Sequence, residues 1–216
     1  MFDRQIRKVV AAPTNQLAGA IERAGVGANQ VTLTGLVLGL ASAGAYAAHL
    51  YLAALGLWLG NRLLDGLDGA LARRCAPSDL GGFLDIVSDF LVYGAFLVGV
   101  AIALPHAALP AIVLFCTYYV SGTAFLALSS LLEKRRRSAP DCRSLHFVGG
   151  IAEGFETVVV YVALCLFPME ATFILWIFAG AVGLTALQRV AFGIAELRRC
   201  PTAPSPHSTA ISKETL

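Results

Sequence analysis

Charge is the scarcest property of this sequence. Only 14% of its 216 residues are charged, whereas 57% are hydrophobic and the mean hydropathy is +0.71; soluble domains carry about 25% charged residues. Residues 24–61 and 90–132 contain no Asp, Glu, Lys or Arg. As helices at about 1.5 Å per residue, these runs are each roughly 60 Å long, about twice the ~30 Å hydrocarbon thickness of a bilayer. The scarcity of charge excludes a soluble globule and predicts two membrane crossings in each run.

Three other signals are missing. The five cysteines form no CxxC pair, so neither a disulfide framework nor a zinc site is expected. The net charge is only +2, and the basic residues form short clusters instead of one stripe, which argues against a nucleic-acid partner. The apolar stretch after the first basic residues is cut at Pro13, which predicts that no signal peptide is removed.

Turn-forming residues divide the apolar sequence into six expected membrane spans. They are expected near residues 31–49, 52–68, 81–104, 110–132, 148–167 and 171–191. Pro105 and Pro168 mark two of the expected connections, because proline does not continue a helix interior.

The ends of the chain differ from this six-span region. Residues 1–28 mix charged and apolar positions, which predicts an amphipathic helix at the membrane surface. Residues 196–216 are rich in Pro, Ser and Thr towards the end, which predicts a disordered tail. The sequence therefore predicts an all-α integral membrane protein with a six-span domain over residues 29–195.

Lys and Arg residues lie on one side of the predicted spans. Those that lie outside the spans, up to residue 199, are Arg4, Arg7, Lys8, Arg23, Arg73, Arg74, Lys134, Arg135, Arg136, Arg137, Arg143, Arg198 and Arg199. Because positive charge favours the cytoplasmic side, both termini are expected in the cytoplasm, with the protein in the inner membrane. The basic run 134–137 either anchors the chain to anionic lipid headgroups or, with Arg143, holds a phosphorylated acceptor.

Four acidic residues stand at the cytoplasmic ends of the second and third spans, where unpaired charge is costly. Asp65 and Asp68 share a helix face with Gly69 and Ala72, and Asp85 and Asp89 share one with Gly81. If the two faces oppose each other, the four carboxylates converge. The nearby small residues Gly66, Gly69, Ala70, Ala72, Gly81 and Gly82 would then admit a bulky ligand.

Carboxylates without His or Cys nearby suit Mg²⁺ or Mn²⁺, and four of them can hold two ions about 4 Å apart. Two such ions indicate phosphoryl transfer. One alternative is that the acids only pair with Arg62, Arg73 and Arg74 at the membrane boundary. Another is a transporter that uses the Asp cluster as a cation site, although such sites are expected near the bilayer midplane.

The run DGLDGALARRCAPSDLGGFLDIVSD, residues 65–89, resembles the signature of the CDP-alcohol phosphatidyltransferase family, D-x2-D-G-x2-A-R followed by G-x3-D-x3-D. The spacer 74–80 is one residue shorter than that pattern. The stretches NRLLDGLDGALARR and GGIAEGFETV are similar to a less characterised bacterial branch, and the resemblance covers most of residues 25–195.

The resemblance implies transfer of a phosphatidyl or related phospho-alcohol group from a CDP-linked donor, such as CDP-diacylglycerol, to an alcohol, with release of CMP. It implies that Asp65, Asp68, Asp85 and Asp89 bind Mg²⁺ or Mn²⁺ and that Asp89 is also the general base. It also implies that Gly69, Ala72 and Arg73 face the CDP moiety, and that the protein is a homodimer. The acceptor stays open between glycerol phosphate, inositol phosphate, serine, an amino alcohol and another lipid.

Two further pairs of residues have alternative interpretations. Glu153 and Glu156 either line the acceptor pocket or favour a helix N-terminus through its dipole. Asn29 and Thr32 either cap the first span or touch the nucleotide, as similar residues do in the family.

Overall fold

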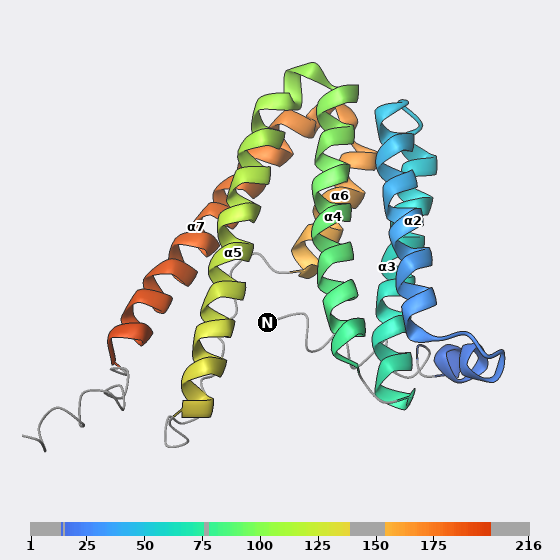
Figure 1. Ribbon diagram of the computed structural model, residues 1–216. Coiled ribbons are helices and arrows are strands. Elements are labelled where there is room, and N and C mark those ends of the chain that lie inside the picture. The colour runs from blue at the N-terminus through green and yellow to red at the C-terminus, as the bar shows by residue number, and fades with distance from the viewer. Residues whose placement is uncertain (1–13, 15, 76–77, 139–153, 200–216) are drawn as a thin grey trace, which may run out of the picture.

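The computed structural model describes residues 14, 16–75, 78–138 and 154–199, and every regular element in these ranges is helical (Figure 1). The long helices are α2 (Ala28–Ala47), α3 (Tyr51–Cys75), α4 (Asp79–Ala103), α5 (Ala108–Ser138), α6 (Gly154–Leu166) and α7 (Ala171–Arg199). Two short 3-10 turns, η1 (Pro105–Ala107) and η2 (Pro168–Glu170), precede α5 and α7. Both turns begin at a proline, as expected for the connections.

The helices pack as two groups joined along α4 and α6. The helix α2 packs against both α3 and α4, while α5 packs along α7 (Figure 1). The helix α4 also contacts α5, and α6 contacts α3. The acid-bearing helices α3 and α4 are thus held in place mainly through α2.

In the described chain, four helical segments are long and apolar enough to cross a membrane: Ala28–Ala47, Asp79–Ala103, Pro105–Lys134 and Pro168–Arg198. The helix α3 is long enough but carries Arg62, Asp65 and Asp68, which lower its hydropathy. The helix α6 is apolar but has 13 residues, and the expected start of its span at residue 148 lies outside the described residues.

The helix ends differ from the expected ones by a few residues. The turn between α2 and α3 lies at residues 48–50, where His49 has a φ of 62°. The helix α5 continues through the basic run to Ser138, and α7 continues to Arg199, beyond the expected end of the domain at residue 195. Residues 133–138 and 196–199 contain no proline or glycine that would end these helices earlier.

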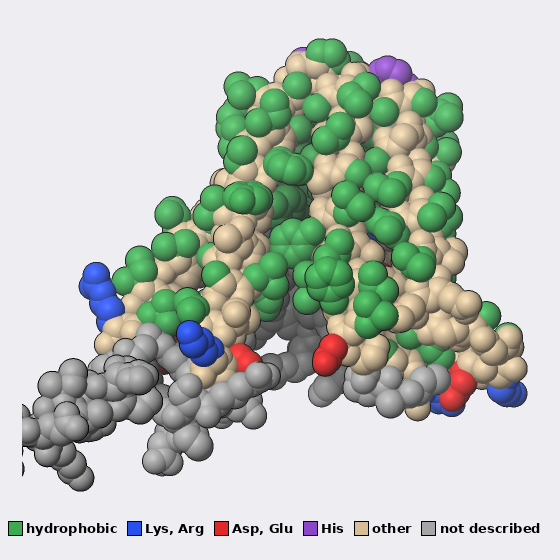
Figure 2. All heavy atoms as spheres, in the orientation of Figure 1, with side chains coloured by type: hydrophobic (Ala, Val, Ile, Leu, Met, Phe, Trp, Pro, Cys, Tyr) green, Lys and Arg blue, Asp and Glu red, His purple; other side chains and the backbone are tan. Residues whose placement is uncertain are grey.

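The core is built from aromatic side chains of several helices. Tyr46, Trp58, Phe96 and Tyr161 are fully buried, and the rings of Phe96 and Tyr161 stack with centroids 4.4 Å apart. On the outside, hydrophobic side chains cover the upper body of the molecule in Figure 2, while the Lys, Arg, Asp and Glu side chains visible in this view gather at the lower end. This division fits a membrane-embedded body with one polar end.

Close packing of α2 on α4 depends on two glycines. A Cβ atom at Gly39 would lie 2.5 Å from Val92 Cγ2, and one at Gly99 would clash with the carbonyl oxygen of Ala43. The absence of side chains therefore lets the two helices approach closely.

The helical residues 16–23 lie across the ends of α2 and α3 (Figure 1). Ala18 is fully buried in a small apolar cluster with Val31, Leu67, Ala70 and Leu71. The expected amphipathic helix is thus present in part, and residues 1–13 lie outside the described residues.

Candidate active site

Three carboxylates converge between α3 and α4. Single oxygen atoms of Asp65, Asp68 and Asp85 all lie within 4.8 Å of one another. Asp65 and Asp68 are one helical turn apart in α3, and Asp85 lies in α4, whose first turn is capped by Ser78 accepting a 3.1 Å hydrogen bond from the backbone N–H of Gly81. The two faces therefore oppose each other, as expected from the spacing.

The helix α2 contributes to this cluster through Thr32. Its hydroxyl donates a 2.6 Å hydrogen bond to Asp68 Oδ2, and its oxygen also lies 3.1 Å from the carbonyl oxygen of Ala28. The side chain does not cap α2, because the residue at the N-cap is Gly27. Asn29 does not cap it either, so the capping interpretation of both residues is wrong.

Asp89 is held differently from the other three acids. Its Oδ1 accepts a 2.9 Å hydrogen bond from Arg62 Nη2, and it is not one of the three carboxylates that share the 4.8 Å cluster. Arg62 also lies 3.7 Å from Asp65 Oδ2 through its Nη1. A buried guanidinium therefore contacts both Asp89 and Asp65, and one of the three arginines considered as partners does pair with the acids.

Two cavities meet at Asp85 and Asp89. The smaller one has a volume of about 10 Å³, room for roughly one water or ion, and is lined by Thr32, Gly35, Leu36, Asn61, Asp65, Asp68, Asp85, Ser88 and Asp89. The larger one, of about 290 Å³, lies between α4, α5, α6 and α7. Asp85 and Asp89 line both cavities and thus form the wall between them.

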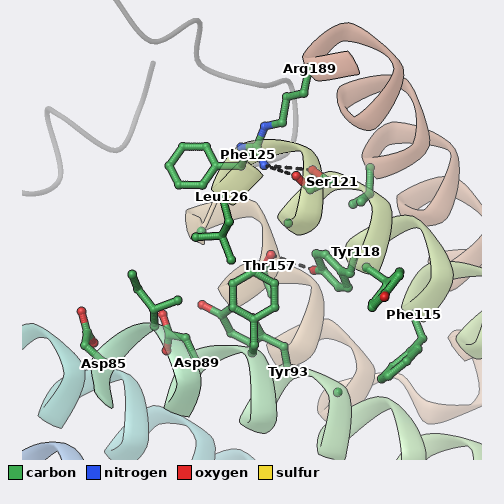
Figure 3. Close-up of a pocket in the computed structure, with 17 residues that line it drawn as sticks. Asp85, Asp89, Tyr93, Phe115, Tyr118, Ser121, Phe125, Leu126, Thr157 and Arg189 are labelled. Carbon is green, nitrogen blue, oxygen red and sulfur yellow. Dashed lines mark hydrogen bonds between the residues drawn. The ribbon is translucent and has the colours of Figure 1, made fainter. Parts of the chain in front are cut away.

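Figure 3 shows the larger cavity, with Asp85 and Asp89 on α4 at one end and Arg189 on α7 at the other. Arg189 Nη1 donates a 2.9 Å hydrogen bond to Ser121 Oγ, and its guanidinium lies 5.3 Å from the ring centroid of Phe125. The cavity thus has acids at one end, a cation at the other and aromatic walls between them. It suits a small molecule that carries both a hydroxyl and an anionic group.

The residues expected to face CDP lie on the last turns of α3. Gly69 and Ala72 are half-buried, and Arg73 is exposed. A Cβ atom at Gly69 would lie 3.4 Å from Arg73 Nη1, whereas one at Gly66 or Gly82 would meet no atom within 4 Å. A ligand can therefore approach α3 and α4 closely at these glycines.

Arg74 and Ala70, which the sequence placed near the acids, stabilise the fold and do not line the site. Arg74 Nε donates a 2.8 Å hydrogen bond to Glu22 Oε2. Ala70 is buried at 1% exposure under the helical residues 16–23, so its assignment to the ligand-facing surface is wrong.

Several site residues escaped the sequence interpretation. These are Asn61, Tyr93, Tyr118, Ser121, Thr157 and Arg189. The only signal for them was polar residues inside apolar runs, which also fits ordinary packing. Glu153 and Arg143 lie outside the described residues, and Glu156 lies in the first turn of α6.

Known proteins are similar to this chain in sequence and in fold. Residues 26–189 match the family model of the CDP-alcohol phosphatidyltransferases. The chain is 37% identical over 201 residues to the inner membrane protein YnjF of Escherichia coli, covering 92% of this chain and 98% of that protein. It is 29% identical over 161 residues to the archaetidylinositol phosphate synthase of Methanothermobacter thermautotrophicus, covering 74% of each chain.

Solved structures of phosphatidylinositol phosphate synthase from Mycobacterium tuberculosis have the same fold. The structure in complex with manganese and citrate superposes with a TM-score of 0.71 at 22% identity, covering 84% of this chain and 88% of that chain. The structure with CDP-DAG bound gives a TM-score of 0.67 at 22% identity, covering 83% and 92%. Because the family model and YnjF both match most of the sequence, this chain is an enzyme of the CDP-alcohol phosphatidyltransferase family.

Proposed function

We propose that this chain transfers a phosphatidyl or related phospho-alcohol group from CDP-diacylglycerol to an alcohol acceptor and releases CMP. The observation that carries the proposal is the convergence of Asp65, Asp68 and Asp85 beside a cavity that Asp89 also lines. The family to which the chain belongs favours the transferase over a transporter that uses the same acids as a cation site.

The donor set of the cluster fits a hard divalent cation. Asp65, Asp68 and Asp85 would hold a first Mg²⁺ or Mn²⁺, and Asp89 would reach the edge of a second. Such ions, when bound, neutralise a diphosphate and stabilise charge on the attacking and leaving oxygens. The solved structure of a protein with the same fold in complex with manganese supports a divalent cation here.

The remaining residues would bind and orient the two substrates. Gly69 and Ala72 would let the CDP moiety lie against α3, and Arg73 would donate to one of its phosphates. The acceptor would enter the 290 Å³ cavity with its hydroxyl at Asp89. The hydroxyl oxygen attacks the β-phosphorus, its proton passes to the Asp89 carboxylate, and the bond to the bridging oxygen breaks, so that CMP leaves with the electron pair.

The same proposal covers the placement of the chain. All six helices α2 to α7 would cross the inner membrane, with residues 1–28 on its surface and both termini in the cytoplasm, and residues 29–195 would form the catalytic domain. The placement is supported by the polar end in Figure 2 and by the inner membrane relative. We further propose a homodimer.

Inositol phosphate is the first acceptor to test. Two relatives are named as synthases of archaetidylinositol phosphate and of phosphatidylinositol phosphate. Glycerol phosphate, serine and an amino alcohol complete the panel.

Purified protein incubated with CDP-diacylglycerol, Mn²⁺ or Mg²⁺ and each acceptor tests the proposal directly. We expect CMP release and a new lipid in equal amounts with one acceptor, and neither product with Asp85→Asn. CMP release that matches no lipid product, or equal release by Asp85→Asn, would contradict the proposed transfer.

A further inference from the structure

One arginine is buried among the acids of the site. The side chain of Arg62 is only 10% exposed, yet it stands on α3 within 4 Å of carboxylate oxygens from two helices, Asp65 on α3 and Asp89 on α4. A charge this deeply buried is costly unless its partners are fixed around it. The contacts of Arg62 therefore indicate its role in the site.

Neutral contacts fix the guanidinium of Arg62 in one orientation. Its Nε donates a 2.8 Å hydrogen bond to Asn61 Oδ1, and its Nη1 donates a 2.8 Å bond to the hydroxyl of Tyr93. Its central carbon lies 4.8 Å from the ring centroid of Trp58 and 5.0 Å from that of Tyr93. Asn61 is itself fixed by a 2.8 Å hydrogen bond from its Nδ2 to the carbonyl oxygen of Gly35 on α2.

This orientation leaves Nη2 of Arg62 to hold one oxygen of Asp89, at 2.9 Å. Asp89 stays in the wall between the two cavities and does not join the cluster of three carboxylates. We propose that Arg62 is a positioning residue, which occupies one oxygen of Asp89 and keeps the other for the acceptor hydroxyl. The inference rests on the proposed function, since it assigns to Arg62 the orientation of the proposed base.

The charge of Arg62 has a second consequence. A permanent positive charge within 4 Å of Asp65 and Asp89 opposes the binding of a divalent cation at the same acids. Arg62 therefore limits the contact between Asp89 and a second ion. Lysine would keep this charge but lose the planar fork that makes the contacts to Asn61, Tyr93 and Asp89 together.

Two substitutions separate the effect of the positive charge of Arg62 from that of the hydrogen-bonding geometry of its guanidinium. Arg62→Met removes both, and Arg62→Lys removes only the geometry. Mn²⁺ binding is measured on the purified protein without donor or acceptor, by the electron paramagnetic resonance signal of free Mn²⁺. Single-turnover transfer is measured with the acceptor that the panel identifies. Arg74→Met is the matched control, because Arg74 lies in the same helix and pairs with Glu22 at the surface.

We expect Arg62→Met to bind Mn²⁺ about tenfold more tightly than the unmodified protein, because a nearby positive charge is gone. We expect Arg62→Lys to keep the Mn²⁺ affinity within about threefold and to lose at least about tenfold in single-turnover rate, because Asp89 is no longer held. The Arg74→Met control should change neither quantity. A merely structural role would lower the folded fraction without tightening Mn²⁺ binding.

Two results would overturn the inference: Mn²⁺ binding by Arg62→Met that is no tighter than before, or full single-turnover activity of Arg62→Lys. If Arg62→Met does not fold, the Lys variant still decides between a positioning and a structural role. If no acceptor supports CMP release, the proposed function fails, whereas the Mn²⁺ comparison still tests the charge of Arg62.

Discussion

Thr32 on α2 and Asp68 on α3 are 36 residues apart in the chain and joined by a 2.6 Å hydrogen bond from the threonine hydroxyl. Both residues are almost completely buried, with 6% and 5% of their surfaces exposed. Thr32 is not itself a proposed metal ligand but orients one, Asp68. Hydrogen bonds of this kind affect how tightly a ligand binds its metal.

Thr32→Val should therefore weaken Mn²⁺ binding by about tenfold, because an equally shaped side chain leaves Asp68 without its donor. Titration of Mn²⁺ against the purified variant measures the effect. Thr32→Ser keeps the hydroxyl and serves as the control, with an affinity close to that of the unmodified protein. Equal affinities of the Val and Ser variants would contradict a role for this hydrogen bond.

Asp85→Asn should abolish the reaction, because it removes a carboxylate that the proposed metal ions need. The substitution removes one of the three clustered carboxylates, and we expect a loss of at least about a hundredfold in kcat. A chelator should stop the unmodified enzyme, and added Mn²⁺ or Mg²⁺ should restore it. Unchanged turnover in chelator would exclude the proposed role of the ions.

Gly69→Leu should prevent binding of the donor without unfolding the protein. A side chain there would enter the space next to Arg73, where CDP is proposed to bind. We expect loss of CDP binding, measured by displacement of a labelled cytidine diphosphate ligand, in a protein that still elutes as a folded species. Gly56→Leu, at an open position of the same helix, is the control. Normal CDP binding by Gly69→Leu would refute the proposed face.

The sequence predicted the helical membrane fold, because hydropathy is a local property. Helical spacing predicted that Asp65, Asp68, Asp85 and Asp89 converge, and the structure brings the first three together and leaves Asp89 outside that cluster. The sequence also placed the turns before α5 and α7, where Pro105 and Pro168 begin the connections. Short-range patterns were sufficient for these features.

The sequence did not predict the partners that arrive from distant helices. The Thr32 bond depends on the close approach of α2, and the position of Arg62 depends on Tyr93, which lies 31 residues further along the chain. Arg189 meets Ser121 across 68 residues. Such contacts depend on how the helices pack, and packing leaves no fixed spacing in the sequence.

Gly39→Ala should destabilise the protein because α2 and α4 touch at this glycine. The added Cβ atom would lie 2.5 Å from Val92 Cγ2, and overpacking of this kind costs about 1–3 kcal/mol. Thermal unfolding in detergent should show a lower Tm than for Gly44→Ala, which places the same atom in open space on the same helix. Adding Val92→Ala should recover part of the loss, and no recovery would mean that another contact is responsible.

Asp89→Asn should separate chemistry from binding. Asp89 lines the cavity proposed for the acceptor and is held by Arg62, whereas Asp68 belongs to the cluster of three carboxylates. An acceptor hydroxyl needs a base within hydrogen-bond reach, and an amide at position 89 cannot take its proton. We therefore expect Asp89→Asn to lose at least about a hundredfold in single-turnover rate while Mn²⁺-dependent binding of CDP-diacylglycerol changes little. Asp68→Asn, by contrast, should weaken that binding as well, because it removes a carboxylate from the cluster. If Asp89→Asn loses donor affinity as severely as Asp68→Asn, then Asp89 acts mainly as a metal ligand and another group is the base.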